Sequence, residues 1–211
     1  MLYADRVTAG RALGSELTHL RATDPLVLGL PRGGVPVAAA VREVIGGDLD
    51  ILLVRKLGVP WQPELAAGAI GEQGVRVINS DVLRQTGLDR ARLDAIEADE
   101  RAELDRRRVL WRGDIPPIPL LDRTVVIVDD GVATGATVVV ACRVARAQRP
   151  RRVVVAVPVS APEALEWIRA EADEVVCPHA PSALAGVGGA YRDFHQLEDS
   201  EVTGLLRPDT R

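Results

Sequence analysis

The chain has 211 residues, of which 47% are hydrophobic and 27% charged, with a net charge of −4. These values are typical of a globular domain with a sizeable core and exclude wholesale disorder. The acidic balance and the 3% of aromatic residues exclude a general nucleic-acid binder that stacks bases on rings, so we expect no nucleic-acid partner.

Neither the cysteines nor the apolar residues indicate a secreted or membrane protein. Cys142 and Cys177 are too few for a disulfide framework, and no Cys/His cluster suggests zinc. No apolar run reaches the roughly 18 residues of a membrane span, and the first residues do not resemble a signal peptide. We therefore expect a cytoplasmic protein with no membrane partner.

Strand and helix patterns alternate along the chain. Apolar runs predict strands at 25–30, 50–55, 124–128, 152–157 and 174–177, and helical spacing predicts helices at 8–21, 35–45, up to about 147, and 161–171. Strands rich in Val, Ile and Leu that are linked by helices are typical of a parallel sheet covered on both faces. We predict an α/β fold: a doubly wound, mainly parallel five-stranded sheet in one domain of residues 1–211.

Two segments interrupt this alternation. Residues 57–122 contain a Pro/Gly-rich stretch, a short strand at 75–78 and a charged helix at about 89–110, which predict a lid loop and a helical insertion. Residues 178–211 are predicted to form a small hood and a C-terminal tail.

The most informative stretch is VVIVDDGVATGAT, residues 125–137. Asp129 and Asp130 follow a buried strand, at the sheet edge where ligands of open α/β sheets bind. The glycines and threonines after them precede a helix, whose N-terminus attracts phosphate. Carboxylates accept hydrogen bonds from sugar hydroxyls, so the stretch predicts a sugar-phosphate site. The alternative is an Asp cap and a glycine turn with no ligand.

This stretch resembles the phosphoribosyl-pyrophosphate motif of type I phosphoribosyltransferases. GLPRGGVPVA, residues 29–38, resembles the family's pyrophosphate loop, and Arg55-Lys56 resembles the Arg-Lys pair of the orotate and adenine members. RKLGVP, PELAAGAI, DDGVATGAT and YRDF together resemble a poorly characterised bacterial branch of predicted phosphoribosyltransferases. The resemblance spans about residues 25–196.

The resemblance also implies roles for individual residues. Asp129 and Asp130 would hold the ribose hydroxyls, while Arg55 and Lys56 would neutralise the leaving group. The 5′-phosphate would lie on the loop made of Gly131, Val132, Ala133, Thr134, Gly135, Ala136 and Thr137. Pyrophosphate would bind Arg32, Gly33 and Gly34, with a cis peptide expected at Arg32–Gly33. Mg²⁺ would bind mainly through substrate oxygens, with no dedicated protein ligands.

Other residues have two readings. Tyr191 and Phe194 lie in the hood, where family members stack the acceptor, but they equally fit local core packing. Glu64 and Glu72 lie in the expected lid, where they either orient a nucleophile or are solvated surface acids.

The resemblance implies a Mg²⁺-dependent enzyme that transfers phosphoribosyl from phosphoribosyl pyrophosphate to a nitrogenous base or related small acceptor. The main alternative is a non-catalytic module that senses phosphoribosyl pyrophosphate or a nucleotide. Hydrolysis of a phosphorylated sugar is a weaker alternative, since no GxSxG motif occurs. The sequence leaves the acceptor and the oligomeric state open, with a homodimer as the commonest default.

Overall fold

A parallel sheet forms the centre of the computed structural model, which describes residues 1–184 and 186–206, with only the backbone at 63 and 64. Its strands are β1 (Leu26–Gly29), β2 (Asp48–Ile51), β6 (Thr124–Val128), β7 (Arg152–Ala156) and β8 (Glu174–Val176). They are ordered β2-β1-β6-β7-β8, and every neighbouring pair is parallel. The predicted five-stranded α/β fold is confirmed.

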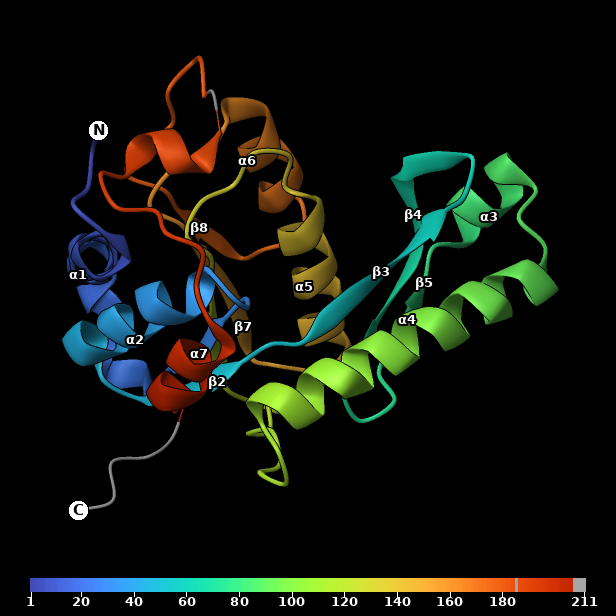
Figure 1. Ribbon diagram of the computed structural model, residues 1–211, viewed down its shortest axis with the longest axis horizontal. Helices are drawn as coiled ribbons and strands as arrows, with labels where there is room; N and C mark the ends of the chain where they lie inside the picture. Colours follow the sequence, from blue (N-terminus) through green and yellow to red (C-terminus); the bar gives the residue numbers. More distant parts are fainter. Residues whose placement is uncertain (185, 207–211) are drawn as a thin grey trace.

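Helices cover both faces of this sheet (Figure 1). Alternate residues of β6 face opposite cores: Ile127 joins the cluster under α5 (Ala136–Ala147) and α6 (Pro162–Arg169). Val126 joins the cluster under α1 (Arg6–Glu16) and α2 (Gly34–Ile45). Both side chains are fully buried, which explains the unbroken Val/Ile run of this strand.

A second, antiparallel sheet corrects two predictions. It consists of β3 (Val54–Val59), β4 (Gln62–Gly71) and β5 (Arg76–Ile78). The strand predicted at 50–55 is therefore two strands: β2 ends at Ile51, and Arg55 belongs to β3. Most of the expected lid loop is a hairpin, in which Leu57 and Val59 of β3 and residues 67–71 of β4 are buried.

The inserted helices cover one face of this hairpin. They are α3 (Ser80–Thr86) and the long α4 (Arg90–Trp111), which runs beside β3 in Figure 1. Leu93, Leu104 and Trp111 of α4 are buried with Leu57 and Ile70 of the hairpin. The same cluster includes Val35 of α2, Ile51 of β2 and Val202 of α7 (Asp199–Leu206), so the insertion shares its core with the main domain. Helix α5 also contacts the hairpin.

Arg112 fastens the end of α4 to both sheets. Its guanidinium donates to Asp50 Oδ1 at 2.7 Å and to Glu72 Oε1 at 2.9 Å, and also to the carbonyl of Ile51 at 3.1 Å. Burial raises the pKa of Glu72, although Arg112 opposes this rise. Glu72 is therefore a buried structural acid, contrary to both readings from the sequence, and the side chain of Glu64 lies outside the described part.

The first residues of the chain lie against the segment around Tyr191. Short 3₁₀ turns, η1 (Thr18–Thr23) and η2 (Val187–Ala190), precede β1 and Tyr191, and α7 (Asp199–Leu206) packs near α2 and α4. The backbone of Tyr3 forms an isolated bridge with Tyr191. Within the described residues, none of the helices combines the length and apolarity needed to cross a membrane.

Candidate sugar-phosphate site

Two loops meet at the carboxyl edge of the central strands. Gly29 at the end of β1 pairs with Val128 at the end of β6, so residues 30–34 and 129–135 leave the sheet side by side. A Cβ at Gly33 would lie 2.0 Å from Asp130 Oδ2, and one at Gly34 would lie 2.5 Å from the carbonyl oxygen of Val128. Only glycine fits at these two positions. The structure thus brings together the predicted pyrophosphate loop and the predicted acids.

The first loop is held by main-chain hydrogen bonds. The N–H of Leu30 donates to Val128 O and that of Gly34 donates to Leu30 O, both at 2.9 Å. The cis peptide lies between Pro31 and Arg32, one residue before the expected position. The Arg32 guanidinium is 3.6 Å from Asp199 Oδ1 of α7, so it faces an acid in this structure.

The two acids are partly buried, and burial raises the pKa of both. Burial, followed by the neighbouring charge of Asp130, raises the pKa of Asp129 well above its usual range. Burial also raises the pKa of Asp130, while Arg6 opposes the rise. Arg6 Nε donates to Asp130 Oδ2 at 2.8 Å, and Asp129 Oδ1 accepts the N–H of Asp130 at 2.9 Å.

The second loop leads into α5 and exposes small and hydroxyl residues. Ala133, Thr134 and Thr137 are exposed, and Gly135 takes a left-handed φ of 82° at the helix start. The first N–H groups of a helix have no partner within it, which suits an anion. Val132 differs from expectation: it is buried, and its N–H donates to Val159 O at 2.9 Å, so that group anchors the loop.

Tyr191 and Phe194 pack against each other and the protein. Tyr191 is 2% exposed, its ring centroid lies 5.0 Å from that of Phe194, and its hydroxyl donates to Asp130 O at 2.5 Å. The Arg6 guanidinium carbon lies 4.0 Å from the Phe194 ring centroid. Of the two readings, local packing is the one observed, and both rings support the acidic loop.

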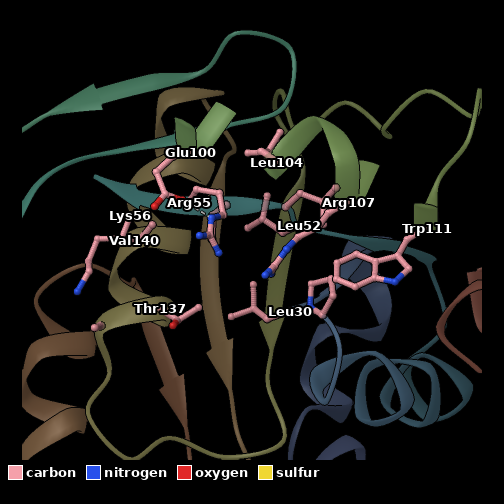
Figure 2. A pocket seen from close by; sticks show the side chains of 14 residues that line it. Leu30, Leu52, Arg55, Lys56, Glu100, Leu104, Arg107, Trp111, Thr137 and Val140 are labelled. Carbon is pink, nitrogen blue, oxygen red and sulfur yellow. Dashed lines mark hydrogen bonds and ion pairs between the residues drawn. The ribbon is translucent and has the colours of Figure 1, made fainter. Parts of the chain in front are cut away.

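A cavity of about 390 Å³ opens beside these loops (Figure 2). Its floor includes Leu30 and Pro31 of the first loop and Ala136 and Thr137 at the start of α5. The other walls come from three elements and include Leu52, Leu53, Val54, Arg55, Lys56, Glu100, Leu104, Arg107, Trp111 and Val140. The predicted Arg55-Lys56 pair thus borders the same space as Leu30 and Pro31 of the first loop and the first turn of α5.

Arg55 has an acidic partner within the cavity wall. Its Nε donates to Glu100 Oε2 of α4 at 2.5 Å, and its side chain is 29% exposed. Figure 2 shows the Arg55 guanidinium pointing into the cavity and Lys56 extending farther out on the same side.

Two charged residues of the site, Arg6 and Glu100, are not predicted from the sequence. A third, Arg107, lies in the run Arg106–Arg108, for which the sequence favours a solvated helix face over an anion or RNA contact. Nothing near Arg6 indicates that α1 would approach the acidic loop. For α4 a signal was present: Glu100, Leu104, Arg107 and Trp111 follow the 4-3-4 spacing of one helix face. Charged residues on an otherwise buried face indicate a polar space opposite them.

Nothing in the described part of the chain forms a ready-made metal site of three or more His, Cys, Asp or Glu side chains. Asp129 and Asp130 supply the carboxylate oxygens of the second loop. Such donors fit a cation that keeps most of its bonds to phosphate and water, as Mg²⁺ does.

Comparison with known proteins gives a consistent result. The family model described as a phosphoribosyl transferase domain matches residues 8–192. A Thermus thermophilus protein of known crystal structure is 45% identical, with a TM-score of 0.92 and 98% of each chain covered.

Two curated proteins from strains of Mycobacterium tuberculosis, whose names assign them only provisionally to the phosphoribosyl transferases, are each 51% identical over 205 residues. These matches cover 97% of this chain but 46% of each relative, so the chain spans about half the length of these relatives.

Proposed function

The chain belongs to the phosphoribosyl transferase domain family, and from this membership we propose that it transfers 5-phosphoribosyl from phosphoribosyl pyrophosphate to a nitrogenous base or related small acceptor. The observation that carries the proposal is the meeting of Asp130, Gly33 and the loop before α5 at one sheet edge. The three parts match the three parts of this substrate: ribose hydroxyls, pyrophosphate and 5′-phosphate.

Each part of the site would bind through ordinary polar contacts. Asp129 and Asp130 accept hydrogen bonds from the ribose 2′- and 3′-hydroxyls. The exposed hydroxyls of Thr134 and Thr137 and the N-terminus of α5 hold the 5′-phosphate. Gly33 and Gly34 let the pyrophosphate approach the backbone closely.

In the reaction, the bond from ribose C1 to the pyrophosphate oxygen breaks, and a bond from C1 to the acceptor nitrogen forms. The acceptor loses a proton, and pyrophosphate leaves with the electron pair. Arg32, Arg55 and Lys56 stabilise the charge that develops on the leaving group, and the cavity walls exclude water from C1. The transition state resembles an oxocarbenium ion, as in other glycosyl transfers.

We propose Mg²⁺ as the cofactor. Asp129 and Asp130 would help to hold it at the sheet edge, where it would supply positive charge to the pyrophosphate group.

One observation favours a second function, non-catalytic sensing of phosphoribosyl pyrophosphate or a nucleotide. Tyr191 is buried against Phe194, and Arg6 lies over the Phe194 ring, so this pair does not offer a free platform for an acceptor base. A sensor needs the phosphoribosyl site but no acceptor site.

Calorimetric titration with phosphoribosyl pyrophosphate, with and without Mg²⁺, tests the shared premise. We expect Mg²⁺-dependent binding, and absence of binding in both conditions would overturn both functions. Incubation with phosphoribosyl pyrophosphate and single bases, followed by pyrophosphate detection, then separates them. Base-dependent release supports the transferase, whereas tight binding without release for any base supports the sensor.

A further inference from the structure

We propose that Arg107, on the inserted helix α4, is an additional ligand for the pyrophosphate group of the substrate. The proposal rests on the proposed function, because it assigns one more residue to the same substrate. It gives the insertion a direct role in binding the substrate.

The position of Arg107 on α4 is the first argument. It follows Leu104 and precedes Trp111 on one helix face, and these two neighbours are only 2% and 7% exposed. The side chain of Arg107 is 34% exposed and paired with Glu103, so its guanidinium keeps polar surroundings at the edge of this buried face. The space that Arg107 reaches is the cavity beside the two loops.

The direction of the side chain is the second argument. In Figure 2 the guanidinium groups of Arg55 and Arg107 point into the same space, with Leu30 and Thr137 across from them. Arg55 comes from β3 and Arg107 from α4, so two separate elements present planar forks of donors to one volume. Such forks match phosphate oxygens.

The charges around the cavity are the third argument. Three of the side chains lining it are cations, Arg55, Lys56 and Arg107, and one is a carboxylate, Glu100. The N-terminus of the 12-residue α5 adds partial positive charge at Ala136. An anion with several oxygens fits this surplus, and Leu30 and Pro31 of the predicted pyrophosphate loop form its floor.

Arg107 is also held in place before any ligand binds. Its Nε donates to Glu103 at 2.6 Å, and its guanidinium carbon lies 5.8 Å from the Trp111 ring centroid. These contacts fix the stem of the side chain while one face of the guanidinium borders the cavity. A ligand therefore meets an already oriented group, which lowers the entropic cost of binding.

A neighbouring residue provides a matched control. Arg106 pairs with the same Glu103, at 2.7 Å, but its side chain is 62% exposed against 34% for Arg107, and it does not line the cavity. R106A and R107A therefore each remove one positive charge from α4 and one arginine partner from Glu103. Only R107A removes a donor from the cavity.

The test is titration of wild-type protein, R106A and R107A with inorganic pyrophosphate and Mg²⁺, and separately with ribose 5-phosphate. We expect R107A to weaken pyrophosphate binding about 10-fold and R106A less than 2-fold, because a hydrogen bond to a charged group contributes roughly that much. Neither variant should change ribose 5-phosphate binding by more than 2-fold. R107K should recover part of the affinity.

Equal affinities of R106A and R107A for pyrophosphate would overturn the inference while leaving the proposed function intact. Equal loss of both ligands in R107A would also overturn it, since this would show a general effect on the fold. Wild-type protein that binds no phosphoribosyl pyrophosphate would overturn the proposed function and this inference together.

Discussion

The two ends of the site are built in opposite ways. The carboxylate end, Asp129 and Asp130, follows the central strand β6 and is packed against the glycines of the neighbouring loop. The cationic end, Arg55, Lys56 and Arg107, comes from the hairpin and α4, outside the main sheet.

Their electrostatics differ as well. At the carboxylate end, burial opposes the charge that binding requires, and Arg6 is the basic partner of Asp130. At the cationic end, Arg55 and Arg107 lie against glutamates in half-exposed positions. The carboxylate end is fixed by the core, and burial of its charged groups lowers stability. The cationic end is held by the insertion, whose attachment can be weakened without changing the carboxylate end.

The largest expected effect comes from detaching that insertion. R112A would leave Asp50 and Glu72 as buried carboxylates without their shared guanidinium, and loss of one partner of a buried pair costs about 3–5 kcal/mol. Urea unfolding should show this loss. R90A on the same helix, with a side chain 93% exposed, should change stability by less than about 0.5 kcal/mol. Similar losses in both variants would contradict the anchoring role.

The carboxylate end is tested by removing both charges. The double variant D129N/D130N should weaken binding of ribose 5-phosphate at least 100-fold, about 2.7 kcal/mol, while circular dichroism stays unchanged. D99N, which removes an exposed acid from α4, is the control and should bind normally. Retained binding in the double variant would refute the ribose role of the acids.

Arg6 links the charge of Asp130 to ligand binding at the carboxylate end. It stabilises the charged form of Asp130, so in R6A the pKa of Asp130 should rise further. Affinity for ribose 5-phosphate should then fall roughly 3–10-fold at pH 7. The acid limb of the plot of affinity against pH should move to higher pH.

Titrations at several pH values check this shift, with R6K giving partial rescue. R11A, from the exposed face of the same helix, should follow the wild-type profile. An unshifted limb in R6A would show that Arg6 acts only through packing.

The smallest expected effect is a gain in stability. Folding raises the pKa of Asp129, so stability falls as the pH rises above about 3.9, the usual pKa of Asp, and the loss is complete above the raised pKa. D129N should therefore melt a few degrees higher than wild type at pH 8, since 1 kcal/mol corresponds to about 2–4 °C at this chain length. The difference should shrink as the pH falls toward about 3.9, the usual pKa of Asp, where both states are increasingly protonated. An unchanged difference across this range would indicate a packing effect instead.

The same contrast separates what the sequence could predict from what it could not. Strand β6 and the residues after it form one contiguous pattern, because a buried strand, two acids and a helix start follow each other directly. For hairpin β3–β4 the sequence predicts a loop, because prolines and glycines in this stretch are typical of loops.

Residues that meet across the fold were harder to predict. Arg6 contacts Asp130 through packing of α1 beside the sheet, and no local pattern encodes that contact. From the sequence alone Tyr191 fits two roles. The hydrogen bond from its hydroxyl to the main chain of the acidic loop identifies packing as the role observed in the structure. In each case the missing information is the relative placement of elements that lie far apart in the sequence.

The close approach of Gly33 to Asp130 also offers a way to sort relatives. Any side chain at position 33 would collide with the carboxylate at 130. The residue at one position therefore restricts which residues the other position can hold. Members that keep this pocket should pair a glycine at the first position with an acid at the second. A larger residue at the first position should accompany loss of the acid, which makes this two-letter combination a marker for screening genomes.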